Sequence, residues 1–164
     1  MVRFRLIAEI RAGSQNVRMA RLTLTYQYDG TPKFILDDFG RLSVSVDTER
    51  FGGRGGFWVQ WQDVREFGER LKTCPIQASS PIAAHWGYEM QEGDDLILRI
   101  EVASANATGD LRVSVEIADD THDRGPRERV RCSFLTNYPQ VEGFSSAIAR
   151  LMDGDWSEAI LEGR

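Results

Sequence analysis

The chain has 164 residues, of which 41% are hydrophobic and 27% charged, and its formal net charge is −5. This length and composition predict one domain, residues 1–164, with a continuous apolar core, and they exclude a chain too polar to fold. The negative charge argues against a general nucleic-acid binder, because phosphate neutralisation needs a surplus of lysine and arginine on one face.

Targeting signals and cysteines predict where the protein resides. Arginines and Glu9 alternate with apolar residues over positions 1–11, so we expect no secretory signal. No apolar run approaches the roughly 20 residues needed to cross a bilayer, so we expect no membrane contact. Cys74 and Cys132 are the only cysteines, too few for a disulfide framework. We therefore expect a cytoplasmic protein.

Alternation of apolar and polar residues predicts that most of the chain is β-strand. In chain order, the alternating stretches are 2–10, 22–28, 42–46, 57–61, 82–88, 96–102, 111–117 and 130–134. The connections at 91–94 and 106–110 are short, polar and contain glycine, as hairpin loops do. They leave no room for crossover helices, so we expect antiparallel pairing.

The run Gly-Gly-Arg-Gly-Gly at residues 52–56 is the strongest break in this pattern. Glycine-rich loops can hold a phosphate at a helix N-terminus, but no Lys-Ser or Lys-Thr pair follows this one, and 57–61 has the pattern of a strand. A single Arg-Gly-Gly element also lacks the repetition of RNA-binding tracts. The run therefore predicts a flexible turn.

The first helical segment follows residue 62. Asp63 and Glu66 have the spacing of an N-terminal capping pair. At helical spacing one face would carry Val64, Phe67 and Leu71. We therefore predict an amphipathic helix that covers part of a sheet.

Two further helical segments lie near the C-terminus. Asn137 and Gln140 predict the cap of a second amphipathic helix. Its apolar stripe would consist of Val141, Phe144, Ile148, Leu151 and Met152. Asp155 and Glu158 predict a last helical turn, which would bear Trp156, Ala159 and Ile160.

Together these elements predict an α+β fold that is mainly β. We expect an antiparallel β-sheet, arranged as a sandwich or a strongly curved half-barrel. Two amphipathic helices and a short C-terminal helical turn would accompany it.

No combination of residues predicts a catalytic, cofactor or metal site. His85 falls on the polar side of its strand and has no nucleophile in a recognisable context. The oxygen and nitrogen donors of residues 119–123, Asp-Asp-Thr-His-Asp, could hold a cation only if the loop folded back on itself, so we interpret them as a solvated hairpin loop. Cys132 alternates inward and is predicted to be a core residue. We therefore predict a non-enzymatic protein without cofactor or metal.

Several residues between Gly56 and Met152 carry a family resemblance. They are Trp58 followed by Asp63-Val64, Phe67 and Leu71, then residues 96–100 and 109–113, and finally Phe144 with Leu151. With these residues the chain resembles the WapI-type immunity proteins of bacterial contact-dependent toxin systems. The resemblance implies an antiparallel sheet packed with two helices, and a role in binding and silencing a toxin domain. It implies no catalytic residues.

The leading hypothesis is a binding protein that meets a protein partner, such as a toxin domain, through an acidic and aromatic surface. Trp58 faces away from Phe57, Val59 and Trp61, so it would be exposed if one face of its strand is uncovered. The candidate contact residues are Trp58, Glu92, Asp94, Asp95, Asp119, Asp120 and Asp123.

The alternative hypothesis is a small-molecule-binding β-sandwich or barrel. In that case an apolar cavity would be lined by the aromatic residues Tyr26, Tyr28, Trp86 and Tyr88. The two hypotheses predict different protein interiors. The binding-protein hypothesis predicts a closed, well-packed core, and the small-molecule hypothesis predicts an apolar pocket.

Overall fold

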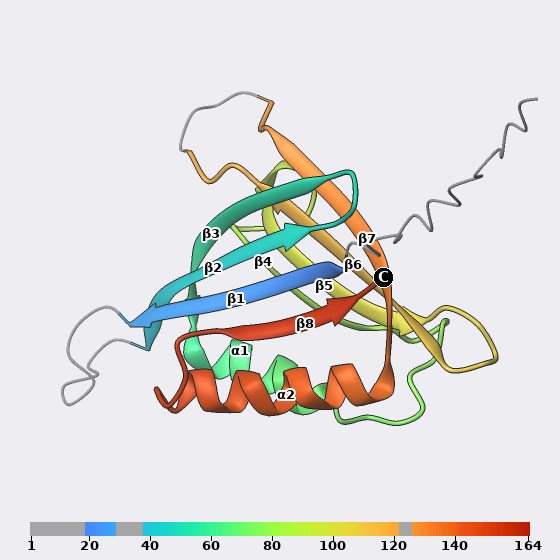
Figure 1. Ribbon diagram of the computed structural model, residues 1–164. Coiled ribbons are helices and arrows are strands. Elements are labelled where there is room, and N and C mark those ends of the chain that lie inside the picture. The colour runs from blue at the N-terminus through green and yellow to red at the C-terminus, as the bar shows by residue number, and fades with distance from the viewer. Residues whose placement is uncertain (1–18, 29–37, 122–125) are drawn as a thin grey trace, which may run out of the picture.

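The computed structural model describes residues 19–28, 38–121 and 126–164, so the predicted strand at 2–10 lies outside the described residues. Within them the chain forms two four-stranded antiparallel sheets and two α-helices (Figure 1). This arrangement confirms the predicted α+β class, mainly β. No helix of the described part is long and apolar enough to span a bilayer.

The first sheet has the strand order β3-β2-β1-β8 and the second β4-β5-β6-β7. The first consists of β1 (Ala20–Tyr28), β2 (Phe39–Asp47), β3 (Gly52–Gln60) and β8 (Ala159–Gly163). The second consists of β4 (Ile82–Gly87), β5 (Leu96–Ser104), β6 (Asp110–Ala118) and β7 (Arg129–Asn137). Strands adjacent in the second sheet are also consecutive in sequence, because short connections join antiparallel neighbours, as the loops at 91–94 and 106–110 predict.

One apolar core lies between the sheets and the helices. Alternate residues of the strands are buried, such as Leu42, Val44 and Val46 in β2, as their alternation predicts. Among the described residues the buried polar side chains are Thr136 and Ser145. Each donates its hydroxyl to a main-chain oxygen, Thr136 to Glu162 and Ser145 to Gly68, at 2.7 Å in both cases. Burial therefore leaves neither hydroxyl unsatisfied.

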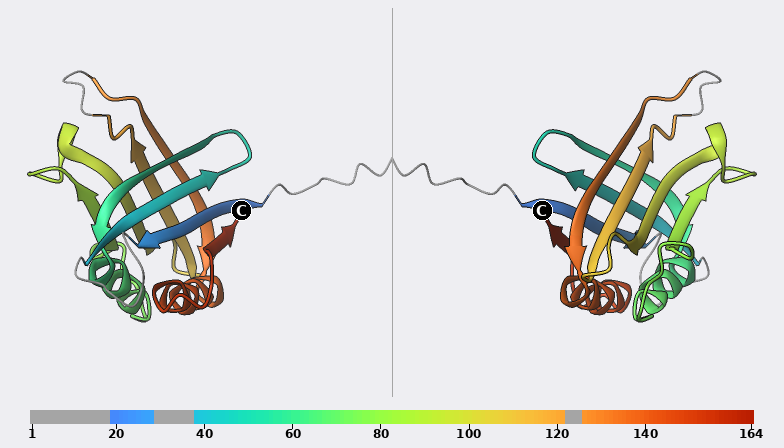
Figure 2. Two further views of the ribbon diagram at one scale, coloured as in Figure 1. Left: turned by 90° about the vertical axis from the view of Figure 1, so that its left-hand side faces the viewer. Right: turned by 90° about the vertical axis from the view of Figure 1, so that its right-hand side faces the viewer.

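The helices α1 (Trp61–Arg70) and α2 (Tyr138–Met152) lie side by side under one end of the sheets (Figures 1 and 2). Val64, Phe67 and Leu71 are buried, and so is the whole predicted stripe of α2. The cap predicted for α2 is confirmed, because the Asn137 side chain accepts from the Gln140 N–H at 3.0 Å. The cap predicted for α1 is wrong. That helix starts at Trp61, whose N–H donates to the Asp38 carbonyl, so Asp63 lies inside the first turn.

The C-terminal segment differs from the predicted helical turn. Ala159 and Ile160 belong to β8, which pairs antiparallel with β1, and Trp156 is 54% exposed. Ala159 and Leu161 are fully buried while Ile160 and Glu162 are partly exposed, which is the two-residue period of a strand. Beyond β8, Arg164 exchanges two main-chain hydrogen bonds with Leu135 of β7, so one seam joins the two sheets.

The glycine run is the second difference. Residues 52–56 form the first half of β3 and are paired with β2, not a flexible turn. A Cβ atom on Gly55 would lie 2.5 Å from Cγ2 of Ile117, and one on Gly53 would overlap Val130. The glycines are thus packing residues that let β3 approach β6 and β7 of the other sheet.

The two cysteines have opposite environments, which predicts unequal reactivity. Cys74 is exposed, whereas Cys132 is buried, as predicted, and burial raises the pKa of its thiol, with a smaller effect from the Asp47 carboxylate. Because the thiolate is the reactive form, we expect a chromogenic disulfide reagent to modify Cys74 at once and Cys132 only in denaturant. A Cys74→Ser variant should show no fast phase. Equal rates for both thiols would contradict this environment for Cys132.

Candidate functional site

Six of the seven predicted contact residues lie in three segments, which Arg41, Arg127 and Arg129 connect, and Asp123 lies outside the described residues. Glu92, Asp94 and Asp95 belong to the β4–β5 connection, and Asp119 with Asp120 follows β6. We call residues 89–95 and 119–121 the acidic loops. Trp58 lies in β3.

Arg127 and Arg129 hold the acidic loops together. Arg127 donates to the main-chain oxygens of Asp94 at 3.1 Å and Asp119 at 2.9 Å. Arg129 donates to the main-chain oxygen of Gly93 at 3.0 Å. The Arg127 guanidinium also lies 5.0 Å from the centre of the Tyr88 ring, and the Tyr88 hydroxyl donates to the Asp120 carbonyl. The two loops therefore form one surface.

Arg41 connects β3 to this surface. It lies opposite Trp58 in the β2–β3 register, and its Nη1 forms an ion pair with Oδ2 of Asp120 at 2.8 Å. The guanidinium passes Gly56, where a Cβ atom would lie 3.3 Å from it. Trp58 is 47% exposed on an edge strand, beside this ion pair. The sequence could not predict this neighbourhood, because it depends on the contact between two sheets.

The predicted carboxylates divide into bound and unbound groups. Asp120 is paired with Arg41, Asp119 accepts from the Thr121 N–H and hydroxyl, and Asp95 accepts from the Met90 N–H. In the part of the chain that the structure describes, the carboxylates of Glu92 and Asp94 form no hydrogen bond or ion pair, and both residues are exposed. Glu92 and Asp94 are therefore the carboxylates most available to a cationic partner.

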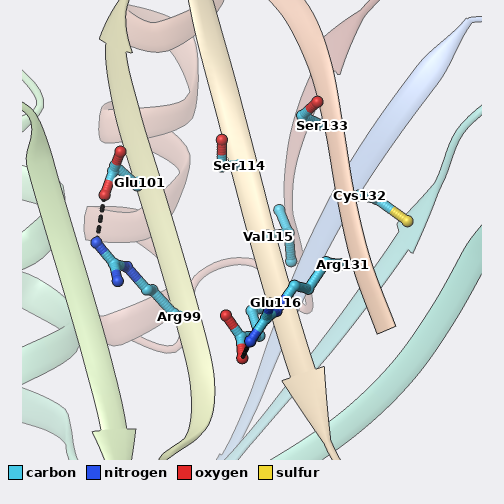
Figure 3. A pocket seen from close by; sticks show the side chains of 8 residues that line it. All are labelled: Arg99, Glu101, Ser114, Val115, Glu116, Arg131, Cys132 and Ser133. Carbon is cyan, nitrogen blue, oxygen red and sulfur yellow. Dashed lines mark hydrogen bonds and ion pairs between the residues drawn. The ribbon is translucent and has the colours of Figure 1, made fainter. Parts of the chain in front are cut away.

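Charged residues that the sequence analysis did not single out line the outer face of the second sheet beside His85. The cross-strand register places His85, Arg99, Glu116 and Arg131 in one row across β4, β5, β6 and β7. Two hollows of about 360 and 480 Å³ lie over this face and share Arg99, Glu116 and Arg131. We call the two together the outer trough. Figure 3 shows the first hollow, with charged side chains and serines projecting from three strands.

Ion pairs organise the charges of the outer trough. Arg129 and Arg131 both contact Oε1 of Glu116, at 2.6 and 3.2 Å respectively. Arg99 pairs with Glu101 at 2.6 Å (Figure 3). In the sequence these residues occupy only the polar positions of alternating strands. That pattern indicates a solvent-facing side, and it does not give the register that brings the charges into one row.

A third hollow of about 220 Å³ lies between β4 and α1 and contains His85 with Asp63, Glu66 and Arg70. Burial raises the pKa of Asp63, and the neighbouring Glu66 carboxylate raises it further. Among the described residues, no group of three or more histidine, cysteine, aspartate or glutamate side chains is arranged to hold a metal ion. His122 lies outside the described residues, so the interpretation of residues 119–123 as a solvated loop stays a prediction.

The aromatic residues of the alternative hypothesis are packed together with the core. Trp86 is 5% exposed and meets Phe67 edge to face. Tyr26 and Tyr28 also meet edge to face, and their hydroxyls donate to the main-chain oxygens of Val59 and Met152. Tyr88 meets Phe57 in the same way. These rings hold parts of the fold together.

No protein-family model and no curated protein matches this chain. The resemblance to WapI-type immunity proteins therefore rests on the residues that carry it. It stays a prediction.

Proposed function

We propose that this protein binds a protein partner through Trp58 and the acidic loops, and that the partner is a basic toxin domain that it neutralises. One observation carries the proposal. The side chain of Trp58 is 47% exposed on an edge strand, and its cross-strand neighbour Arg41 forms an ion pair with Asp120 of the acidic loops. Tryptophan is among the residue types most enriched at the positions that dominate the energy of a protein interface.

The charge of the acidic loops supports a basic partner. Residues 89–95 contain Glu89, Glu92, Asp94 and Asp95 and no lysine or arginine. The carboxylates of Glu92 and Asp94 extend from main chain that Arg127 and Arg129 fix in place. A cationic surface would approach these carboxylates faster than a neutral one, and high salt would reduce that advantage.

The filled interior supports a protein partner over a ligand held between the sheets. Trp86 packs against Phe67, and the tyrosines of the alternative hypothesis donate to main-chain oxygens. On this view the two sheets, joined at Arg164 and Leu135, are a strongly curved half-barrel that displays the loops. The unpaired Cys74 and Cys132 support the cytoplasmic location that we propose for it.

Replacing Trp58 by alanine tests this proposal. The partner is first recovered by co-purification from the native cytoplasm, identified, and tested as a toxin that the protein neutralises. We expect Trp58→Ala to raise the dissociation constant about 30-fold, because a central aromatic anchor contributes at least about 2 kcal/mol. Calorimetry measures the change, and survival of cells that express the toxin measures neutralisation.

The matched control is Trp156→Ala, since Trp156 has a similar exposure of 54% and lies outside the proposed surface. It should leave the dissociation constant within about twofold, because exposed contacts away from an interface contribute little. Unchanged binding by Trp58→Ala would refute Trp58 as the anchor. A recovered partner without toxic activity would refute the immunity role.

A further inference from the structure

We propose that the outer trough is a second binding site, for a ligand that carries a carboxylate or phosphate group. It lies on the outer face of β4-β5-β6-β7; Trp58 does not line it, whereas Glu92 and Gly93 of the acidic loops line its larger hollow. The ligand would bind over β6 and β7, where Arg131, Ser114 and Ser133 line the smaller hollow (Figure 3).

The shape of the trough comes from the β4–β5 connection, which rises beside the sheet. The larger hollow is lined by Met90, Gln91, Glu92 and Gly93 of this connection and by Arg99 and Arg131 of the sheet. The bond from Arg129 to the Gly93 carbonyl fastens this wall to β7. The trough is therefore bounded by bonded main chain and by the sheet, and it exists without a ligand.

On the β7 side of the trough, two guanidiniums contact one carboxylate. Arg129 Nη1 forms an ion pair with Glu116 Oε1 at 2.6 Å, and the two side chains are only 16% and 15% exposed. Arg131 makes a longer contact of 3.2 Å to the same carboxylate oxygen and is 73% exposed. One carboxylate thus serves two guanidiniums. A planar guanidinium with unused donors is suited to bind a carboxylate or phosphate through two parallel hydrogen bonds.

Two serines lie on the same face of the sheet as Arg131, further along β6 and β7 (Figure 3). Ser114 and Ser133 are direct cross-strand partners, and Ser133 lies two residues from Arg131 on the same face of β7. Both line the hollow, and neither hydroxyl makes a hydrogen bond within the described residues. Together they add two neutral donors to the charged one, which is the donor set that an oxyanion requires.

The carboxylates facing the trough restrict where the anion can bind. Glu101 lies opposite Ser114 in the register and is paired with Arg99 at 2.6 Å. Glu116 is neutralised by Arg129. Glu92, unpaired among the described residues, lines only the larger hollow, so an anion fits in the smaller hollow on the β7 side, nearest Arg131 and Ser133.

The test is a titration of the full chain, followed by nitrogen–proton NMR at low ionic strength, with inorganic phosphate and, separately, with succinate. We expect saturable shifts of the Ser114, Arg131 and Ser133 amides with at least one anion. Saturation with phosphate alone identifies a phosphoryl ligand, and saturation with succinate alone identifies a carboxylate ligand. Arg131→Gln should weaken binding about tenfold, because it removes a charged hydrogen-bond donor.

The matched control is Arg112→Gln. Arg112 is an exposed arginine on the same face of β6 that does not line the trough, so its loss should change affinity less than about twofold. Ser133→Ala gives a second variant with an expected loss of several-fold, because it removes one neutral donor. Shifts that fail to saturate with both anions, or equal losses for Arg112→Gln and Arg131→Gln, would overturn the proposal.

Discussion

A Gly55→Val variant is expected to lose about 3 kcal/mol of its free energy of unfolding. A Cβ atom at this position would lie 2.5 Å from Cγ2 of Ile117, and the two γ-methyl groups of valine extend further into the other sheet. Ile117 is 3% exposed and part of the core, so it has little space into which to move. Inserting carbons into a close-packed core typically costs about 1–3 kcal/mol, and two sheets must separate here. Urea unfolding measures the loss.

Gly143→Ala provides the control for this prediction. Gly143 is exposed in the interior of α2, and a Cβ atom there would meet nothing within 4 Å. Alanine should stabilise the helix by about 0.5–1 kcal/mol, because glycine loses more backbone entropy on folding. If Gly55→Val instead unfolds at the wild-type urea concentration, β3 does not pack against β6, and the glycine run is a turn after all.

A Phe67→Ala variant is expected to lose about 3–5 kcal/mol, the usual range for removing a buried phenylalanine. Phe67 is fully buried in α1 and meets the Trp86 ring of β4 edge to face, with ring centroids 6.4 Å apart. The change leaves a cavity where α1 attaches to the second sheet. Thermal or urea unfolding, followed by tryptophan fluorescence, gives the size of the loss.

The control is Phe51→Ala, which makes the same chemical change at a residue that is 68% exposed. Its free energy of unfolding should stay within about 0.5 kcal/mol of the wild type. Similar losses for the two variants would show that α1 contributes no more to the core than an exposed loop does.

The strands and the helix stripes were predictable because burial acts on a fixed period. Leu42, Val44 and Val46 alternate with serines, and Phe144, Ile148 and Leu151 repeat at helical spacing, so each set has one buried face. The cap at Asn137 was predictable for a related reason, since its partner, the Gln140 N–H, lies three residues away. Such features depend on neighbours in the sequence.

What the sequence did not reveal depends on contacts between distant segments. Gly53 and Gly55 have no side chains to show a period, and Val130 and Ile117, which explain them, lie more than sixty positions away. Ala159 and Leu161 form a strand because β1 offers a partner edge, while Asp155 and Glu158 imitate a helical cap. The outer trough requires the register of four strands, and the short alternating stretches do not fix that register.

Arg127 and Arg129 hold the acidic loops in place by donating hydrogen bonds to the main-chain oxygens of Asp94, Asp119 and Gly93. Every residue type carries such an oxygen, so these hydrogen bonds do not depend on the identity of the loop side chains. Substitutions at Glu92 or Asp94 can therefore alter the charge that the loops present while the loop backbone keeps its shape. Under the proposed function, such a scaffold would exchange one partner for another in single mutational steps, each leaving a folded protein.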